Sequence, residues 1–266
     1  MKEVGGMGNP VLWEQRGSAG YIRLNRPEQL NALNGEMLDA LGGLVGRIGQ
    51  NPRDIRVVLI SGEGRAFCAG ADLKERRTLS EQQVRRNLGK IREVFAAIEG
   101  LPQPTIAVMN GYALGGGMEL ALCCDFRYSI RKAQMGLTEV GLGIIPGAGG
   151  TQRLPRLLGT AKAKELILTA RKIGADQALA LGLLNGVAED PEQLKGMSEA
   201  LAAELLANAP LAVYQAKHAI DKGMDSDLAA GMAIEWKAYE ATLATKDRLE
   251  ALEAFREKRP PRFKGE

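Results

Sequence analysis

Two long stretches of this 266-residue chain are almost free of charge, and each contains a single carboxylate. In residues 100–124 the only charged residue is Glu119, and in residues 133–152 it is Glu139. An ionised carboxylate in an apolar setting is costly unless it finds a partner or shifts its pKa. We therefore expect both stretches in the interior, where a cavity holding both groups would suit acid–base chemistry near neutral pH. The alternative for either residue alone is a helix end that reaches solvent.

Within the first of these stretches, residues 100–118 carry no charge and approach the length of a membrane-spanning helix. They contain Pro102, Pro104 and Asn110 among several glycines, which predict a loop, a strand, a turn and the start of a helix instead. We expect a buried core segment and no membrane association.

The composition is that of an ordinary soluble protein, with 45% hydrophobic and 25% charged residues. The 35 basic and 32 acidic residues leave a net charge of +3, which is too small to predict a nucleic-acid-binding surface. Cys68, Cys123 and Cys124 follow no regular spacing, which favours reduced thiols. The segment MKEVGGMGNP has neither the apolar core of a secretory signal nor the composition of a transit peptide. These features predict a cytoplasmic protein.

Short β-rich runs alternate with helical apolar spacing in the first half of the chain. We expect strands at residues 11–15, 20–24, 56–60 and 105–109, and helices at residues 36–49, 80–98 and 116–124. This alternation predicts a layered α/β fold. From about residue 160 the pattern is nearly all helical, with helices expected at residues 192–207, 211–222, 228–243 and 247–257.

Two glycine-containing turns lie between these expected elements. Gly115, Gly116 and Gly117 separate a strand from a helix, where a ligand can approach bare backbone N–H groups and the positive end of the helix dipole. Such a place can stabilise an oxyanion, and the turn at residues 67–72 could supply a second N–H. The alternative for each turn is tight packing alone. No phosphate-loop or dinucleotide-binding glycine motif occurs in the chain.

Three segments in this order, AFCAGADLKE, NGYALGGGMELALCCD and GLGIIPGAGGTQRLPRLLG, resemble the crotonase superfamily of enoyl-CoA hydratases and isomerases. The resemblance runs from about residue 11 to the C-terminus. It implies a spiral of ββα units in residues 1–195, which would carry the active site. It also implies a helical region in residues 196–266 that assembles homotrimers, often paired into hexamers.

The resemblance also implies roles for individual residues. Ala71 and Gly116 would provide the two N–H groups of an oxyanion hole. Glu119 would hold and deprotonate water, and Glu139 would exchange a proton at the α-carbon of the thioester. Their separation, 139 − 119 = 20 residues, matches the hydratase pattern of the family.

Coenzyme A would be bound as part of the substrate, and the resemblance implies no metal and no separate cofactor. The residues expected to contact it on the oxyanion loops are Ala69, Gly70, Asp72, Leu73, Lys74 and Gly115. Phe255 and Lys258 would reach the CoA phosphates of a neighbouring subunit.

Because both glutamates are present, a hydratase is favoured over an isomerase or another crotonase-type acyl-CoA enzyme. The segments GADLKERR and TKDRLEALEAFREKRPPRFKGE resemble the methylglutaconyl-CoA hydratase branch of leucine degradation. A distal carboxylate on such a substrate would need a cation, for which Arg76 and Arg77 are the candidates. The alternative is that both arginines are solvated charges beside a loop.

Two further functions are disfavoured. Some relatives of that branch bind RNA through a lysine-rich early helix, but residues 37–56 contain only three arginines and also two aspartates. We therefore expect no nucleic-acid partner. The only histidine, His218, lies in a helical segment and is expected to be structural or exposed rather than catalytic.

Overall fold

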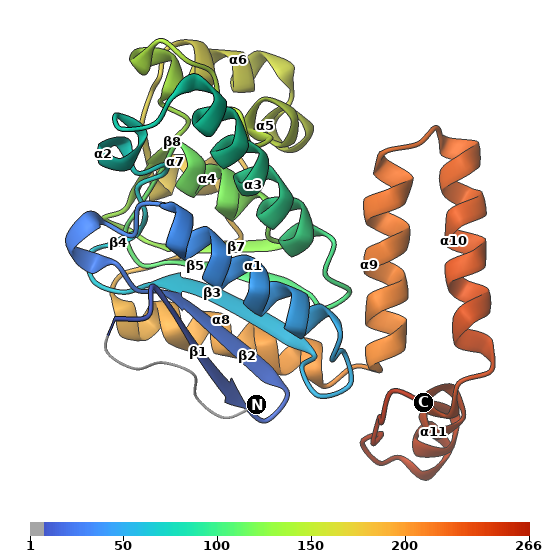
Figure 1. Ribbon diagram of the computed structural model, residues 1–266. Coiled ribbons are helices and arrows are strands. Elements are labelled where there is room, and N and C mark those ends of the chain that lie inside the picture. The colour runs from blue at the N-terminus through green and yellow to red at the C-terminus, as the bar shows by residue number, and fades with distance from the viewer. Residues whose placement is uncertain (1–7) are drawn as a thin grey trace.

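A computed structural model describes residues 8–266 (Figure 1). Residues 1–7 lie outside the described residues. They make up most of the segment MKEVGGMGNP, in which we expect no targeting signal. The main sheet has six strands in the order β1-β2-β3-β5-β7-β10. Their bounds are β1 Val11–Arg16, β2 Ala19–Leu24, β3 Val57–Gly62, β5 Thr105–Met109, β7 Phe126–Ile130 and β10 Gly186–Ala188. β1 and β2 are antiparallel, and every later pair is parallel.

A second sheet of four short strands has the order β4-β6-β8-β9. Its strands are β4 Ala66–Cys68, β6 Tyr112–Leu114, β8 Gln134–Gly136 and β9 Ile173–Gly174. In both sheets the spatial order of the strands is their order along the chain, so each strand–strand–helix unit stacks on the one before it. The predicted α/β spiral is confirmed. The expectation that the chain is nearly all helical after residue 160 is wrong at two places, β9 and β10.

Helices cover both faces of the main sheet. In Figure 1, α1 Gly35–Gly49 and α3 Glu81–Glu99 lie above β3, and α8 Pro191–Leu206 lies below it. The burial of β3 explains this arrangement: Val58 and Ile60 belong to the large core on one face, while Val57 and Leu59 pack with Ala202 of α8 on the other. A parallel strand that is buried on both faces needs apolar residues at every position, which explains the continuous apolar run at the start of β3.

Shorter helices lie between the strands and the longer helices along the chain. They are η1 Pro27–Gln29, α2 Leu73–Arg76, α4 Gly116–Leu122, η2 Glu139–Leu142, α5 Gly150–Leu158, α6 Thr160–Leu168 and α7 Ala175–Ala180. The longer helix α3 begins at Ser80, as predicted, where the Ser80 hydroxyl and the Gln83 side chain form a capping box. No helix among the described residues is long and apolar enough to cross a membrane.

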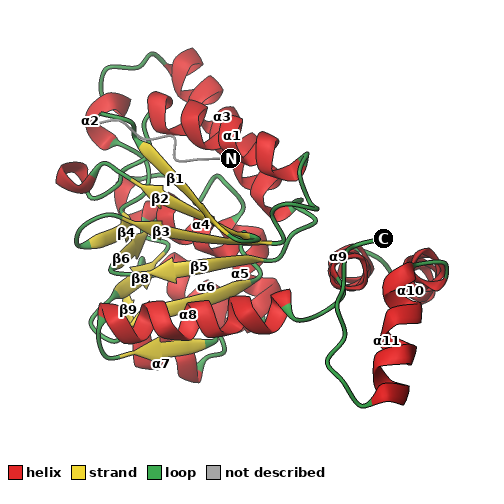
Figure 2. Ribbon diagram, turned by 90° about the horizontal axis from the view of Figure 1, so that it is seen from below, coloured by secondary structure: helices red, strands yellow, loops and turns green. Residues whose placement is uncertain are grey.

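The last three helices form an arm beside the body: α9 Pro210–Met224, α10 Leu228–Leu243 and α11 Lys246–Glu257 (Figures 1 and 2). Polar contacts join it to the body, including a hydrogen bond from Tyr214 Oη to the Pro52 carbonyl (2.7 Å) and an ion pair between Lys217 and Asp125. The division expected between residues 195 and 196 remains a prediction about domains. Residue 195 itself lies within α8, and the chain leaves the body between α8 and α9.

Candidate active site

Glu119 lies in the first turn of α4 and is 3% exposed. Its Oε1 accepts hydrogen bonds from the backbone N–H groups of Ala148 and Gly150, both at 2.8 Å. Burial raises the pKa of Glu119 above its usual value, while these two N–H groups and the positive charge of Arg153 oppose the rise. The Glu119 carboxylate is therefore buried and, at one oxygen, held firmly in place.

Glu139 begins η2 and is 9% exposed. Its Oε2 is buried and has no hydrogen-bond partner among residues 8–266. Burial, together with the nearby negative charge of Glu119, raises the pKa of Glu139 to about 7. The two carboxyl groups thus differ: the pKa of Glu139 lies close to neutral pH, whereas two N–H groups and Arg153 oppose the rise in the pKa of Glu119.

Gly115 connects the two glutamates. It follows β6 directly, with φ at +51°, and caps α4, whose first turn carries Glu119. A Cβ atom on Gly115 would lie 3.1 Å from Oε1 of Glu139. The glycine therefore permits both an unusual backbone conformation and the close approach of the Glu139 carboxylate.

Two unpaired backbone N–H groups lie beside this turn. Leu33 donates to the Gly70 carbonyl at 2.8 Å and accepts from Asp72 N at 3.0 Å, which leaves the Ala71 N–H on the opposite side of the loop. A Cβ on Gly116 would lie 3.6 Å from Ala71 N. Within residues 8–266, neither Ala71 N–H nor Gly116 N–H has a hydrogen-bond partner. An oxyanion between the two loops could accept from both groups.

Asp72 anchors the loop that carries Ala71. Its Oδ1 caps α2 by accepting from Lys74 N at 3.0 Å, and its Oδ2 accepts from Arg26 at 2.9 Å. Burial alone would raise the pKa of Asp72, but the Arg26 hydrogen bond and the capped N–H groups lower it. In this chain Asp72 is therefore a charged anchor of the loop that carries Ala71.

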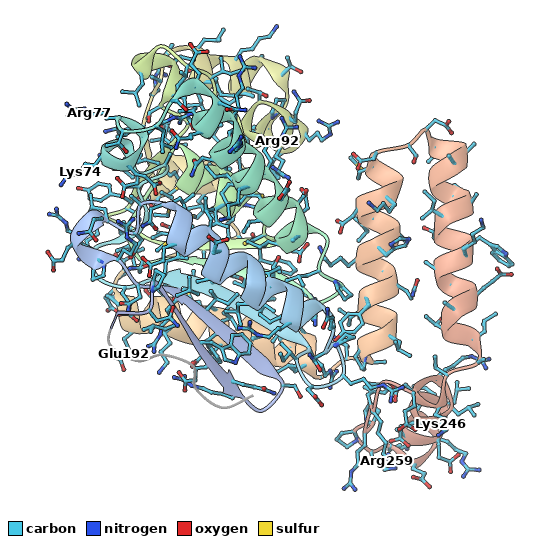
Figure 3. All side chains as sticks on the ribbon, in the orientation of Figure 1. Lys74, Arg77, Arg92, Glu192, Lys246 and Arg259 are labelled. Carbon is cyan, nitrogen blue, oxygen red and sulfur yellow. The ribbon has the colours of Figure 1, made fainter. Side chains whose placement is uncertain are left out.

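The structure brings the remaining predicted residues together only in part. Gly70 is buried against the Leu114 carbonyl and Gly116 N, and Ala69 beside it is partly exposed. Leu73, Lys74 and Arg77 are exposed and Arg76 is partly buried; Figure 3 shows Lys74 and Arg77 at the outer edge of the body. Phe255 on α11 and Lys258, which caps the C-terminal end of this helix, are exposed. In Figure 1, α11 lies apart from α4, the helix that carries Glu119.

The residues that hold Glu119 were not predicted from the sequence. They belong to the turn Gly147–Gly150 and to α5, which follows it. The signal was present: a Gly-Ala-Gly-Gly run before a helix offers free N–H donors next to a buried carboxylate. Also not predicted were three exposed apolar side chains that follow Glu139 closely in the sequence, namely Leu142, Ile144 and Ile145.

Paired buried carboxyl groups and two free N–H groups define a site for acid–base chemistry at a carbonyl compound. Among the described residues, no group of three or more His, Cys, Asp or Glu side chains could hold a metal ion. The chain belongs to the enoyl-CoA hydratase/isomerase family, whose sequence model matches residues 14–266.

Similar proteins span the whole chain. YngF of Bacillus subtilis, whose name assigns it provisionally to the enoyl-CoA hydratases and isomerases, is 52% identical over 261 residues, which cover 97% of this chain and 100% of YngF. The mitochondrial methylglutaconyl-CoA hydratase of Mus musculus is 47% identical, covering 95% of this chain and 81% of that protein. The crystal structure of an enoyl-CoA hydratase from Bacillus anthracis superposes with a TM-score of 0.94 at 47% identity, covering 97% of this chain and 100% of that one.

Proposed function

We propose that the chain is an enoyl-CoA hydratase, which adds water reversibly across the 2,3 double bond of a 2-enoyl thioester of coenzyme A. The observation that carries this proposal is the pair of buried glutamates in unequal environments, beside two unpaired N–H groups. Family membership supports the same class of reaction.

The first requirement of the reaction is to stabilise the enolate that forms at the thioester carbonyl. Ala71 N–H and Gly116 N–H would both donate to that oxygen, which carries more charge in the transition state than in the substrate. Each such donor contributes about 3 kcal/mol in enzymes of this kind. Because the two N–H groups are backbone atoms, they require no reorganisation during the reaction.

The second requirement is one base and one acid. Glu119, with two N–H groups on Oε1, would be ionised and would take a proton from water as the water oxygen bonds to C3. Glu139, with a pKa of about 7, would carry a proton and would deliver it to C2. Dehydration is the reverse, with the proton on Glu119 at the start, so both directions use a pair that holds one proton in total.

We propose further that the chain acts as a homotrimer, alone or paired into a hexamer. The arm exposes large apolar side chains that a neighbouring subunit would cover: Ile220, Met224, Leu228, Met232, Trp236, Tyr239, Leu243, Leu249, Leu252 and Phe255. Such an assembly would allow Phe255 and Lys258 to reach the coenzyme A of another subunit. Light scattering after size exclusion would show a trimer or hexamer for the wild type and smaller species for Trp236→Arg; a wild-type monomer would contradict the proposal.

For the substrate we propose a methylglutaconyl-type thioester, on the strength of the resemblance to that branch and the 47% identity to the mouse enzyme. Arg76 is partly buried beside the oxyanion loop and is the better placed of the two candidate cations; Arg77 is exposed. Arg76→Ala should lower selectivity for the carboxylated substrate over crotonyl-CoA, with Arg77→Ala as the comparison. Unchanged selectivity in both variants would show that neither arginine binds the distal carboxylate of the substrate.

The test of the main proposal is the loss of enoyl-thioester absorbance with crotonyl-CoA and 3-methylglutaconyl-CoA. Glu119→Gln and Glu139→Gln should each lower kcat by at least about 100-fold. Glu192→Gln is the matched control, because Glu192 lies on the surface at the start of α8 (Figure 3). The alternative, an isomerase that needs one carboxylate, predicts conversion of a 3-enoyl thioester by wild type and by one of the two Gln variants.

A further inference from the structure

We infer that Arg153 and Glu99 form a positioning pair, which holds the Ala148–Gly150 turn and, through it, the carboxylate of Glu119. The kinetic part of this inference rests on the proposed hydratase function. The contacts themselves do not.

A continuous chain of hydrogen bonds joins the pair to Glu119. The Arg153 guanidinium binds the Glu99 carboxylate with two hydrogen bonds, from Nε and Nη2, both at 2.6 Å. Its Nη1 donates to the Ala148 carbonyl at 2.9 Å. The N–H of the same Ala148 donates to Oε1 of Glu119 at 2.8 Å. A two-point Arg–carboxylate contact fixes direction as well as distance, so the guanidinium is held in one orientation against the turn.

Gly149 provides independent support, because its backbone is shaped around the guanidinium. Its φ is +107°, and a Cβ there would lie 2.0 Å from Nη1 of Arg153. The Gly149 carbonyl accepts from the Arg153 and Gln152 N–H groups, both at 2.9 Å, so the turn and the start of α5 form one unit. A side chain at position 149 would therefore collide with the guanidinium.

The charge of Arg153 also reaches Glu119. The titratable groups that face Glu119 are Glu139 on η2, Cys123 on α4, Arg153 on α5 and, beyond it, Glu99 on α3. Of these, Arg153 is the cation, and its charge lowers the pKa of Glu119. The Arg153 side chain is 19% exposed, so its field is only partly screened by solvent.

Substitutions separate the contribution of the turn geometry from that of the charge. Arg153→Gln removes both. Arg153→Lys keeps the charge but cannot make the two-point contact. Glu99→Gln weakens the orientation of the guanidinium and keeps its positive charge. Arg156→Gln, one turn further along α5 and exposed, is the matched control.

With crotonyl-CoA we expect Arg153→Gln and Glu99→Gln to lower kcat by on the order of 10-fold to 100-fold with little change in KM, because misplacing a reacting group impairs the chemical step. The acidic limb of the kcat/KM profile should move to higher pH in Arg153→Gln, but not in Arg153→Lys, Glu99→Gln or Arg156→Gln. A merely structural ion pair would lower thermal stability and leave the limb in place.

A second measurement does not depend on activity. Carbon-13 NMR of glutamate-labelled protein, with the Glu119 signal assigned through its loss in Glu119→Gln, gives the titration of this carboxyl directly. If the pKa of Glu119 rises in Arg153→Gln and in no other variant, the inference is supported even when neither thioester is hydrated. Absence of hydration would contradict only the proposed function. Titration and kcat unchanged from wild type in folded Arg153→Gln would overturn the inference.

Discussion

Glu119 and Glu139 are held unequally: two backbone N–H groups from another turn bind Glu119, whereas the Glu139 carboxylate accepts from its own backbone N–H, and the charge of Glu119 raises the pKa of Glu139. Oε1 of Glu119 accepts two such bonds, whereas Oε2 of Glu139 has none within the described residues. This inequality decides which carboxyl group keeps the proton. It also sets the pH dependence of both rate and stability.

The kcat/KM for hydration should follow a bell-shaped pH profile, since the proposed mechanism needs Glu119 ionised and Glu139 protonated. With the pKa of Glu139 near 7, activity should fall as pH rises above about 7. Hydration consumes no net proton, so the profile for dehydration should have the same limbs. Initial rates between pH 5 and 9 test this, and a profile that stays flat from pH 6 to 9 would contradict the proton assignment.

Glu139→Gln should make the protein more stable above neutral pH. The native pKa of about 7 lies above the ordinary glutamate value of 4.5, so the native state binds more protons between these values and loses stability as pH rises through them. The amide in Glu139→Gln cannot ionise, so the variant does not lose this stability. The free energy of unfolding that it retains is roughly 2–3 kcal/mol at pH 8. Denaturant unfolding at pH 5 and pH 8 measures it. A variant whose advantage over wild type is equal at both pH values would show that Glu139 ionises normally in the folded chain.

Gly115→Ala should abolish most activity in a folded protein. The added methyl group would press on Oε1 of Glu139, and φ at +51° is unfavourable for alanine. Gly46→Ala is the control, because Gly46 lies in α1 with open space around it and should gain stability as alanine. Rates and melting temperatures of the two variants check this; wild-type kcat in Gly115→Ala would mean that Glu139 is free to move away.

Lys217→Met should loosen the arm from the body. Lys217 forms an ion pair with one oxygen of Asp125, and the other oxygen accepts from both the N–H and the hydroxyl of Thr105. Without Lys217, the half-buried Asp125 carboxylate would have no cation beside it. Because the pair is partly exposed, we expect a loss of about 2 kcal/mol, below the 3–5 kcal/mol of a fully buried pair. Hydrogen exchange in α9 should rise in Lys217→Met and not in Lys222→Met, an exposed lysine of the same helix. Equal exchange in both variants would make the ion pair incidental.

The sequence predicted the long elements and the two glutamates for clear physical reasons. Short β-rich runs predicted β3 and β5, Ser80 predicted the start of α3, and the absence of other charge marked Glu119 and Glu139 as buried. What it did not predict is the second sheet, whose strands are two or three residues long. Segments that short have no period of their own and are strands only because a neighbouring unit pairs with them.

The same limit applies to the site. The Gly147–Gly150 turn is obvious as a turn, but its contact with Glu119 spans 29 and 31 residues of sequence, and no local pattern encodes that distance. Arg153 lies at the edge of a charge-free stretch and reads as an ordinary surface arginine until its carboxylate partner, 54 residues earlier, is known. Arg76 and Arg77 show the converse. They are adjacent in the sequence, directly after the loop that carries Ala71, yet Arg76 is partly buried and Arg77 is exposed.

Both sheets keep their strands in chain order, and this has a consequence for how the protein is made. As the chain leaves the ribosome, each new unit finds its docking surface already complete, and no segment has to be threaded between earlier ones. The oxyanion loop emerges first, then the helix of Glu119, then Glu139, and last the turn that grips Glu119. A nascent chain halted before residue 150 would therefore carry both acids but could not yet hold Glu119 in place.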